Sequence, residues 1–334
     1  MQSFFKKLPR YSLRLLLAYL VYIFTGGVLA YLLPRQARNL PQTDSFYGIG
    51  RGPDRAVLVE EPQDAFARRV EVIRTAQSTL DVCYHCVKSG ETTECFFAEL
   101  LRAADRGVRV RVLLDGTVGG LSGARSNIAL ALRAHPNIEY RIYNPVDLLR
   151  PWEWNALLHD KFILADDRML LLGGRNIGDE YFAPPGYEGA VTYDRDVLVL
   201  NDLAGTPDSS ESVTAQAKIY MDTLWDAPET DKFGTLSPSR RADGLAAQEY
   251  LKETAARWEA AAPSFYLPSE PASQCAVPTQ RVTLLHNPVS PFKKEPTLGA
   301  TLAQLLSGCQ KIRLQTPYAT ANPSTLAALT RLAK

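Results

Sequence analysis

The order of helix-like and strand-like segments is the feature that most restricts the fold of this chain. Between residues 63 and 143, runs with apolar residues at helical spacing alternate with short apolar runs typical of strands. The expected helices cover residues 63–77, 94–105 and 127–135, and the expected strands cover residues 79–87, 108–114 and 138–143. Helices that alternate with strands pack on a largely parallel or mixed sheet. The sequence therefore predicts an α/β fold.

Residues 159–172 have the pattern of a β-hairpin. An alternating run is followed by a turn signal at residues 166–168 and by a second apolar run. Successive side chains on a strand point to opposite faces, so His159 and Lys161 are expected on the same face. A base or nucleophile would therefore stand beside a fixed cation on a rigid element.

Two glycines and an asparagine follow the hairpin. Gly173 and Gly174 allow the backbone to turn tightly and to approach a ligand closely. The side-chain amide of Asn176 can donate a hydrogen bond to an anionic oxygen. Together with His159 and Lys161, these residues indicate an anion site.

This spacing resembles the signature of the phospholipase D superfamily, HxKxxxxD followed by Gly-Gly-x-Asn. The matching positions are His159, Lys161, Asp166, Gly173, Gly174 and Asn176. The stretch RNIGDEYF (residues 175–182) resembles the bacterial cardiolipin synthase-like branch more closely than the nuclease branch. The resemblance implies a phospholipase D-like α-β-α sandwich with a mixed sheet.

The resemblance also implies a chemistry. Members of the superfamily use two HxK motifs without a metal or other cofactor, and one histidine becomes a transient phosphohistidine. On that basis His159, Lys161 and Asp166 are the candidate catalytic residues, with His159 as nucleophile. Lys161 and Asn176 are the candidate phosphate ligands. Asp166 closes the turn, and its position after the strand does not aim it at His159, which favours a structural role.

An acidic residue on a later strand orients the catalytic histidine in this superfamily. Asp196, which directly precedes the expected strand 197–200, is the position we assign to that role, and Asp194 is the second choice. The physical requirement is that the attacking nitrogen be unprotonated and the tautomer fixed.

Only one HxK motif is present among the four histidines of the chain, because none of the others has a lysine two residues later. A weak internal repeat begins at residue 281. Residues 281–289, 298–306, 311–319 and 324–334 parallel the first strand, helix, strand and helix of the first domain in the same order, which places a second motif beyond residue 334. Three explanations remain open. The chain is a fragment of a two-motif enzyme, it pairs with another copy as a homodimer, or it is catalytically inactive.

The N-terminus is expected to be a single-pass membrane anchor. Leu15 to Leu33 contains no charge for nineteen residues, which is long enough to span a bilayer. The basic residues before it orient the anchor with the globular part outside the cytoplasm, at the cell membrane. The alternative is a cleaved signal peptide, because residues 28–30 have the small-residue pattern of a cleavage site.

The expected organisation has five parts. They are an anchor or signal segment (1–34), a linker (35–55), a first phospholipase D-like domain (56–262), a connection (263–280) and the start of a second, incomplete domain (281–334). Cys83 and Cys86 form a lone CxxC without a second pair at zinc-like spacing, so we interpret them, and His85 between them, as structural.

Three functions follow from these observations. The first is a membrane-anchored phosphatidyltransferase that acts on a phosphatidylglycerol-like phospholipid, as in cardiolipin synthesis. The second is a phospholipase, or a phosphodiesterase that cleaves nucleic acid, but the net charge of +1 gives no broad attraction to nucleic acid. The third is an inactive membrane-bound module that lacks half of the site.

Overall fold

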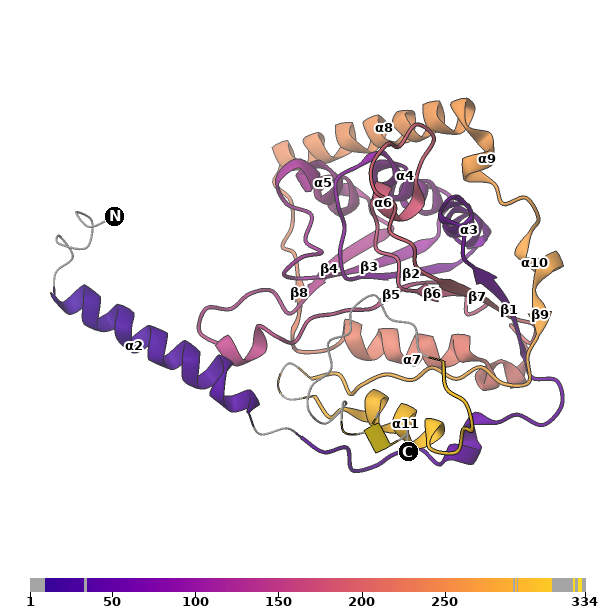
Figure 1. The fold of residues 1–334 in the computed structure, drawn as a ribbon. Coiled ribbons are helices and arrows are strands. Elements are labelled where there is room, and N and C mark those ends of the chain that lie inside the picture. Colours follow the sequence, from indigo (N-terminus) through magenta and orange to yellow (C-terminus); the bar gives the residue numbers. More distant parts are fainter. Residues whose placement is uncertain are drawn as a thin grey trace. The chain divides into compact units, whose positions relative to one another are not determined.

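A computed structural model shows the fold of the chain (Figure 1). The described residues are 10–32, 35–290, 292, 294–313, 327, 330 and 331. The chain divides into two compact units. The smaller consists of residues 1–46, 146–156 and 285–334, and the larger of residues 47–145 and 157–284.

The larger unit is built on one mixed sheet of nine strands. The strands are β1 (Asp54–Val59), β2 (Thr79–Tyr84), β3 (Arg109–Asp115), β4 (Ile138–Tyr143), β5 (Lys161–Ala165), β6 (Met169–Gly173), β7 (Asp196–Asn201), β8 (Thr230–Lys232) and β9 (Val277–Pro278). Their order is β8-β4-β3-β2-β5-β6-β7-β1-β9. The pairs β2/β3 and β3/β4 are parallel, and the other pairs are antiparallel. The mixed α/β sheet predicted from the sequence is therefore confirmed.

Helices cover both faces of this sheet. The helices of the larger unit are α3 (Pro62–Thr75), α4 (Glu91–Asp105), α5 (Ser126–Ala134), α6 (Asp179–Phe182), α7 (Val213–Trp225), α8 (Pro238–Ala261), α9 (Pro263–Tyr266) and α10 (Ala272–Cys275), with 3-10 turns at Gly123–Arg125 and Pro207–Glu211. Figure 1 shows α3, α4, α5 and α8 on one face and α7 on the other. The result is an α-β-α sandwich.

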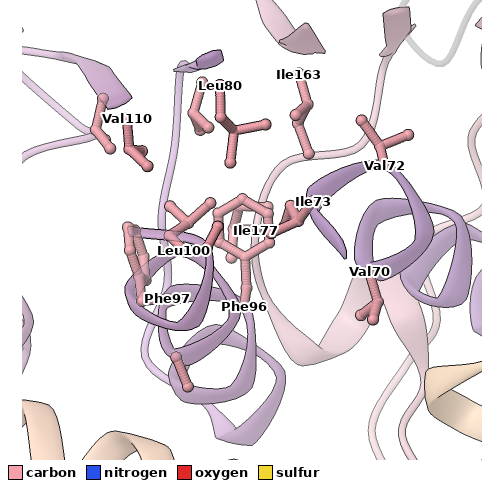
Figure 2. Close-up of a cluster of buried hydrophobic side chains, with 14 of the residues drawn as sticks. Val70, Val72, Ile73, Leu80, Phe96, Phe97, Leu100, Val110, Ile163 and Ile177 are labelled. Carbon is pink, nitrogen blue, oxygen red and sulfur yellow. The ribbon is translucent and has the colours of Figure 1, made fainter. Parts of the chain in front are cut away.

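The main core lies between the sheet and helices α3 and α4. In β2 the side chains of Leu80 and Val82 point into it and are fully buried, as the alternation of a strand requires. Figure 2 shows Leu80 and Ile163 of the sheet opposite Ile73 of α3 and Phe96 of α4.

Local sequence signals set the ends of the helices. Pro62 occupies the first turn of α3, and Gly107, with a φ of +94°, follows the end of α4.

The segments that carry the candidate site residues meet at one end of the sheet. Strands β1 to β4 and β6 end there, and β5 and β7 begin there, as their pairing shows. Tyr84 pairs with Lys161 and Gly173 pairs with Asp196, and the register of β5 with β6 puts all four residues level with one another. The residues just beyond these positions therefore meet at the same edge.

The smaller unit contains the N-terminal helix α2 (Arg10–Gly27), the 3-10 helices Leu29–Tyr31, Thr43–Phe46 and Pro151–Glu153, and α11 (Thr297–Leu306). Within it Tyr22 packs edge-on against Trp152, with ring centroids 6.0 Å apart. None of the helices in the described part of the chain has both the length and the apolar character needed to cross a membrane. The anchor expected over residues 15–33 is not supported, because α2 begins with Arg10 and Arg14 and ends at Gly27.

The repeat expected from residue 281 onward falls only partly within the described residues. Helix α11 occupies the position expected for a helix at residues 298–306. The expected segments 311–319 and 324–334 lie almost wholly outside the described residues.

Candidate active site

The predicted hairpin is present as β5 and β6, with its turn at residues 166–168. Asp166 adopts a φ of +51°, and its carboxylate accepts hydrogen bonds from the backbone N–H groups of Gln77 (2.6 Å), Ser78 (2.8 Å) and Thr79 (2.7 Å). Asp166 thus ties the turn to the start of β2. It follows the last residue of β5, whereas His159 precedes the first. The catalytic role predicted for Asp166 is therefore corrected, because its carboxylate holds the opposite end of the strand.

His159 and Lys161 lie at the beginning of β5. Lys161 is buried (6% exposed), and its Nζ donates to the carbonyl oxygen of His159 at 2.7 Å. The ammonium is thereby fixed beside the exposed His159. Burial lowers the pKa of Lys161, and the nearby Asp160 and Asp194 oppose that change.

His159 is held in its neutral form. Partial burial, the Lys161 cation and His85 lower the pKa of His159 to about 4. At neutral pH a nitrogen lone pair of the imidazole is therefore available for attack, which is what a nucleophilic or basic histidine requires.

Asn176 reaches the same edge on the loop after β6. Its Oδ1 accepts from the N–H of Cys86, and its Nδ2 donates to the hydroxyl of Tyr181, each at 3.1 Å. A bridge between Val87 and Ile177 fixes this loop against the end of β2. The amide thus has a set orientation, and its second N–H can reach an anion.

Asp196 lies in a buried ion-pair cluster. Its carboxylate accepts from Arg69 Nη1 at 2.9 Å and from Arg175 Nη1 at 3.0 Å, and all three side chains are buried. Burial opposes ionisation, but Arg69 and Arg175 hold the pKa of Asp196 below its usual value. Two guanidinium groups thus pair with this carboxylate, and its histidine-orienting role stays a prediction.

Asp194, the second choice, lies closer to the site. A Cβ at Gly174 would collide with the carboxylate of Asp194, so the glycine permits this close approach. The charge of Asp194 also acts on Lys161, whose pKa it raises in opposition to burial. The carboxylate is therefore near the Lys161 ammonium.

Two residues of this edge were missed by the sequence reasoning, His85 and Asp115. The rings of His85 and His159 have centroids 4.4 Å apart. Asp115 is buried, and its charge raises the pKa of His159 in opposition to burial. The sequence predicts a structural role for His85 and does not place it beside His159. The signal that could have found both is their position at the carboxyl ends of β2 and β3, where polar residues of a sheet gather at one edge.

An imidazole, a buried ammonium and an oriented amide at one edge form a candidate site for phosphoryl chemistry. Among the residues that the structure describes, no three His, Cys, Asp or Glu side chains are grouped so that they could hold a metal ion.

Part of the chain is similar to known proteins. Residues 70–199 match the family described as "Cardiolipin synthase, PLD-like domain". The segment is similar to cardiolipin synthase C of Escherichia coli (strain K12), with 39% identity over 152 residues, which is 42% of this chain and 31% of the relative. An uncharacterized protein of Helicobacter pylori (strain ATCC 700392 / 26695) is also 39% identical over 138 residues, 38% of this chain and 27% of that protein.

Among solved structures, NucT from Helicobacter pylori is similar, with a TM-score of 0.42 and 15% identity over 54% of this chain and 99% of NucT. Residues 70–199 form a domain similar to the cardiolipin synthase, PLD-like family. The matched segment spans less than a third of the length of the curated relatives named above.

Proposed function

We propose that this domain supplies the nucleophile-bearing half of a phosphatidyltransferase site of the cardiolipin synthase type. The observation that carries the proposal is the position of His159 directly beside the buried ammonium of Lys161, which donates to the carbonyl oxygen of His159 at 2.7 Å. A neutral imidazole can attack phosphorus, and the ammonium can neutralise the phosphate oxygens. The similarity to cardiolipin synthase C supports a phospholipid as the substrate class.

The proposed reaction has two steps. A ring nitrogen of His159 bonds to phosphorus, the bond from phosphorus to the departing alcohol breaks, and an acid protonates that alkoxide. In the second step the same acid, now a base, takes the proton of an incoming alcohol, whose oxygen displaces His159. Lys161 and Asn176 hold the phosphate oxygens in both steps. We propose that the acid comes from a second HxK motif, in a further part of the protein or in a second copy of the chain.

The test is conversion of phosphatidylglycerol to cardiolipin and glycerol by the full-length protein in mixed micelles. We expect His159→Ala to abolish conversion. His135→Gln is the matched control, because His135 bonds to Asp105 and precedes the start of β4, at the opposite end of the sheet. Equal product from His159→Ala and wild type would reject the assignment. Single-stranded DNA is the contrasting substrate, and cleavage of DNA without lipid conversion would favour a nuclease instead.

A further inference from the structure

Leu158, the residue before His159, forms a hydrogen bond at each of its two backbone polar groups. The N–H of Leu158 donates to Asp115 Oδ2 at 2.8 Å, and its carbonyl oxygen lies 2.8 Å from His85 Nδ1. The other oxygen of Asp115 accepts from the N–H groups of Thr117 (2.9 Å) and Val118 (3.0 Å). Residues at the ends of β2 and β3 therefore fix the backbone immediately before His159.

The contact with Leu158 defines the proton position on His85. A carbonyl oxygen only accepts, so His85 Nδ1 carries the hydrogen, and in the neutral ring Nε2 has the lone pair. The side chain of His85 is 13% exposed, and its ring faces that of His159 at an interplanar angle of 51°. The His85 ring is thus held in place and packs against the imidazole of His159. His85 can itself take a proton.

The charged groups around the two rings differ. His85 Nδ1 lies 4.0 Å from Asp115 Oδ2 on β3, and Asp160 and Lys161 of the β5 segment act on it as well. His159 faces Lys161 and His85, with Asp115 as the opposing negative charge. Burial and the Lys161 cation lower the pKa of His85, whereas its hydrogen bond to a backbone carbonyl oxygen and the Asp115 carboxylate oppose that fall. The carboxylate close to Nδ1 thus stabilises the charged form of His85.

We propose that His85 is a positioning residue for His159, which fixes the plane of the nucleophilic ring and takes the first proton that reaches the pair. A positive charge on His85 then repels a positive charge on His159, because the two ring centroids are only 4.4 Å apart. His159 therefore stays neutral. The catalytic part of this inference rests on the proposed function of His159.

The direct test is an NMR titration of histidine ring signals in the wild type and in His85→Phe. Phenylalanine keeps a packed ring but cannot carry a charge. We expect the pKa of His159 to rise by about one unit in His85→Phe, the effect of a unit charge about 4 Å away in a water-like medium. His135→Gln is the control and should leave His159 unchanged. An unchanged titration of His159 in a folded His85→Phe protein would overturn the proposal.

A second variant separates packing from charge. In His85→Gln the side-chain amide can still donate to the Leu158 carbonyl oxygen, and the charge is lost, so the pKa of His159 should rise here as well. Turnover gives the second readout. In both variants the acid limb of kcat should move to higher pH with little change in KM, and an acid limb that does not move would overturn the positioning role. The titration can show that protonation of His85 lowers the pKa of His159 even if the protein turns over no phosphodiester. In that case the proposed function fails, but the interaction between the two histidines stands.

Discussion

Replacement of Asp196 by asparagine separates a structural from a catalytic role for this carboxylate. Asp196 is the shared acceptor of Arg69 and Arg175, and Arg69 also bonds to the hydroxyl of Tyr84 at 3.0 Å. The asparagine would keep the shape of the side chain, but it would remove the negative charge from between two buried guanidinium groups. Neither arginine can lose its own charge at accessible pH.

The magnitude follows from the burial of the cluster. Removing one partner of a buried ion pair costs about 3–5 kcal/mol, because the remaining charge is uncompensated. The side chains of Asp196 and Arg175 are 0% exposed and that of Arg69 is 2% exposed, so solvent cannot screen the loss. We therefore expect Asp196→Asn to lower the free energy of unfolding by about 3–5 kcal/mol, which is a fall of roughly 6–20 °C in Tm for a unit of this size.

The measurement is urea unfolding followed by circular dichroism, with Asp194→Asn as the matched control. Asp194 is only partly buried, so its variant should unfold within about 0.5 kcal/mol of the wild type. Asp194→Asn should instead lower turnover, since its carboxylate lies near Lys161. The reasoning would be refuted if Asp196→Asn were as stable as wild type and selectively lost turnover.

Three further predictions concern the turn, the glycines and the pH profile. Asp166→Ala removes the acceptor of three backbone N–H groups and should lower the free energy of unfolding by about 2–4 kcal/mol, measured by urea unfolding; a loss below about 0.5 kcal/mol would contradict it. Gly174→Ala should reduce kcat at least tenfold, because the new Cβ displaces Asp194; Gly120→Ala, where a Cβ meets nothing, is the control, and equal kcat values would argue against this. Because the imidazole of His159 must be unprotonated, turnover should rise with pH through about 4 and then stay level to neutrality; a midpoint near 6.5 in a pH–rate profile would contradict the lowered pKa.

The fold could be predicted largely because it depends on local patterns. The alternation of Leu80 and Val82 with their neighbours, and the glycine after α4, mark elements that the structure contains. The sequence could not show which acidic side chains form ion pairs with which basic side chains. Asp194 and Asp196 are two residues apart on one segment, and only the packing of Arg69 from α3 and Arg175 from the loop after β6 shows that Asp196 is the one that pairs with two buried guanidinium groups.

The contribution of His85 was hidden for a related reason. His85 and His159 are far apart in sequence, and only the antiparallel pairing of β2 with β5 places their rings 4.4 Å apart. The uncharged run of residues 15–33 does not show where a helix ends, and α2 ends at Gly27.

The central claim is that His159 attacks phosphorus, and a covalent adduct tests it most directly. The full-length protein would be mixed with phosphatidylglycerol, quenched with alkali within milliseconds to seconds, digested and analysed by mass spectrometry. The account predicts an acid-labile phosphatidyl adduct on His159 that forms before product and is absent from His159→Asn. Conversion of the lipid by His159→Asn at the wild-type rate, with no adduct on His159 in the wild type, would contradict it.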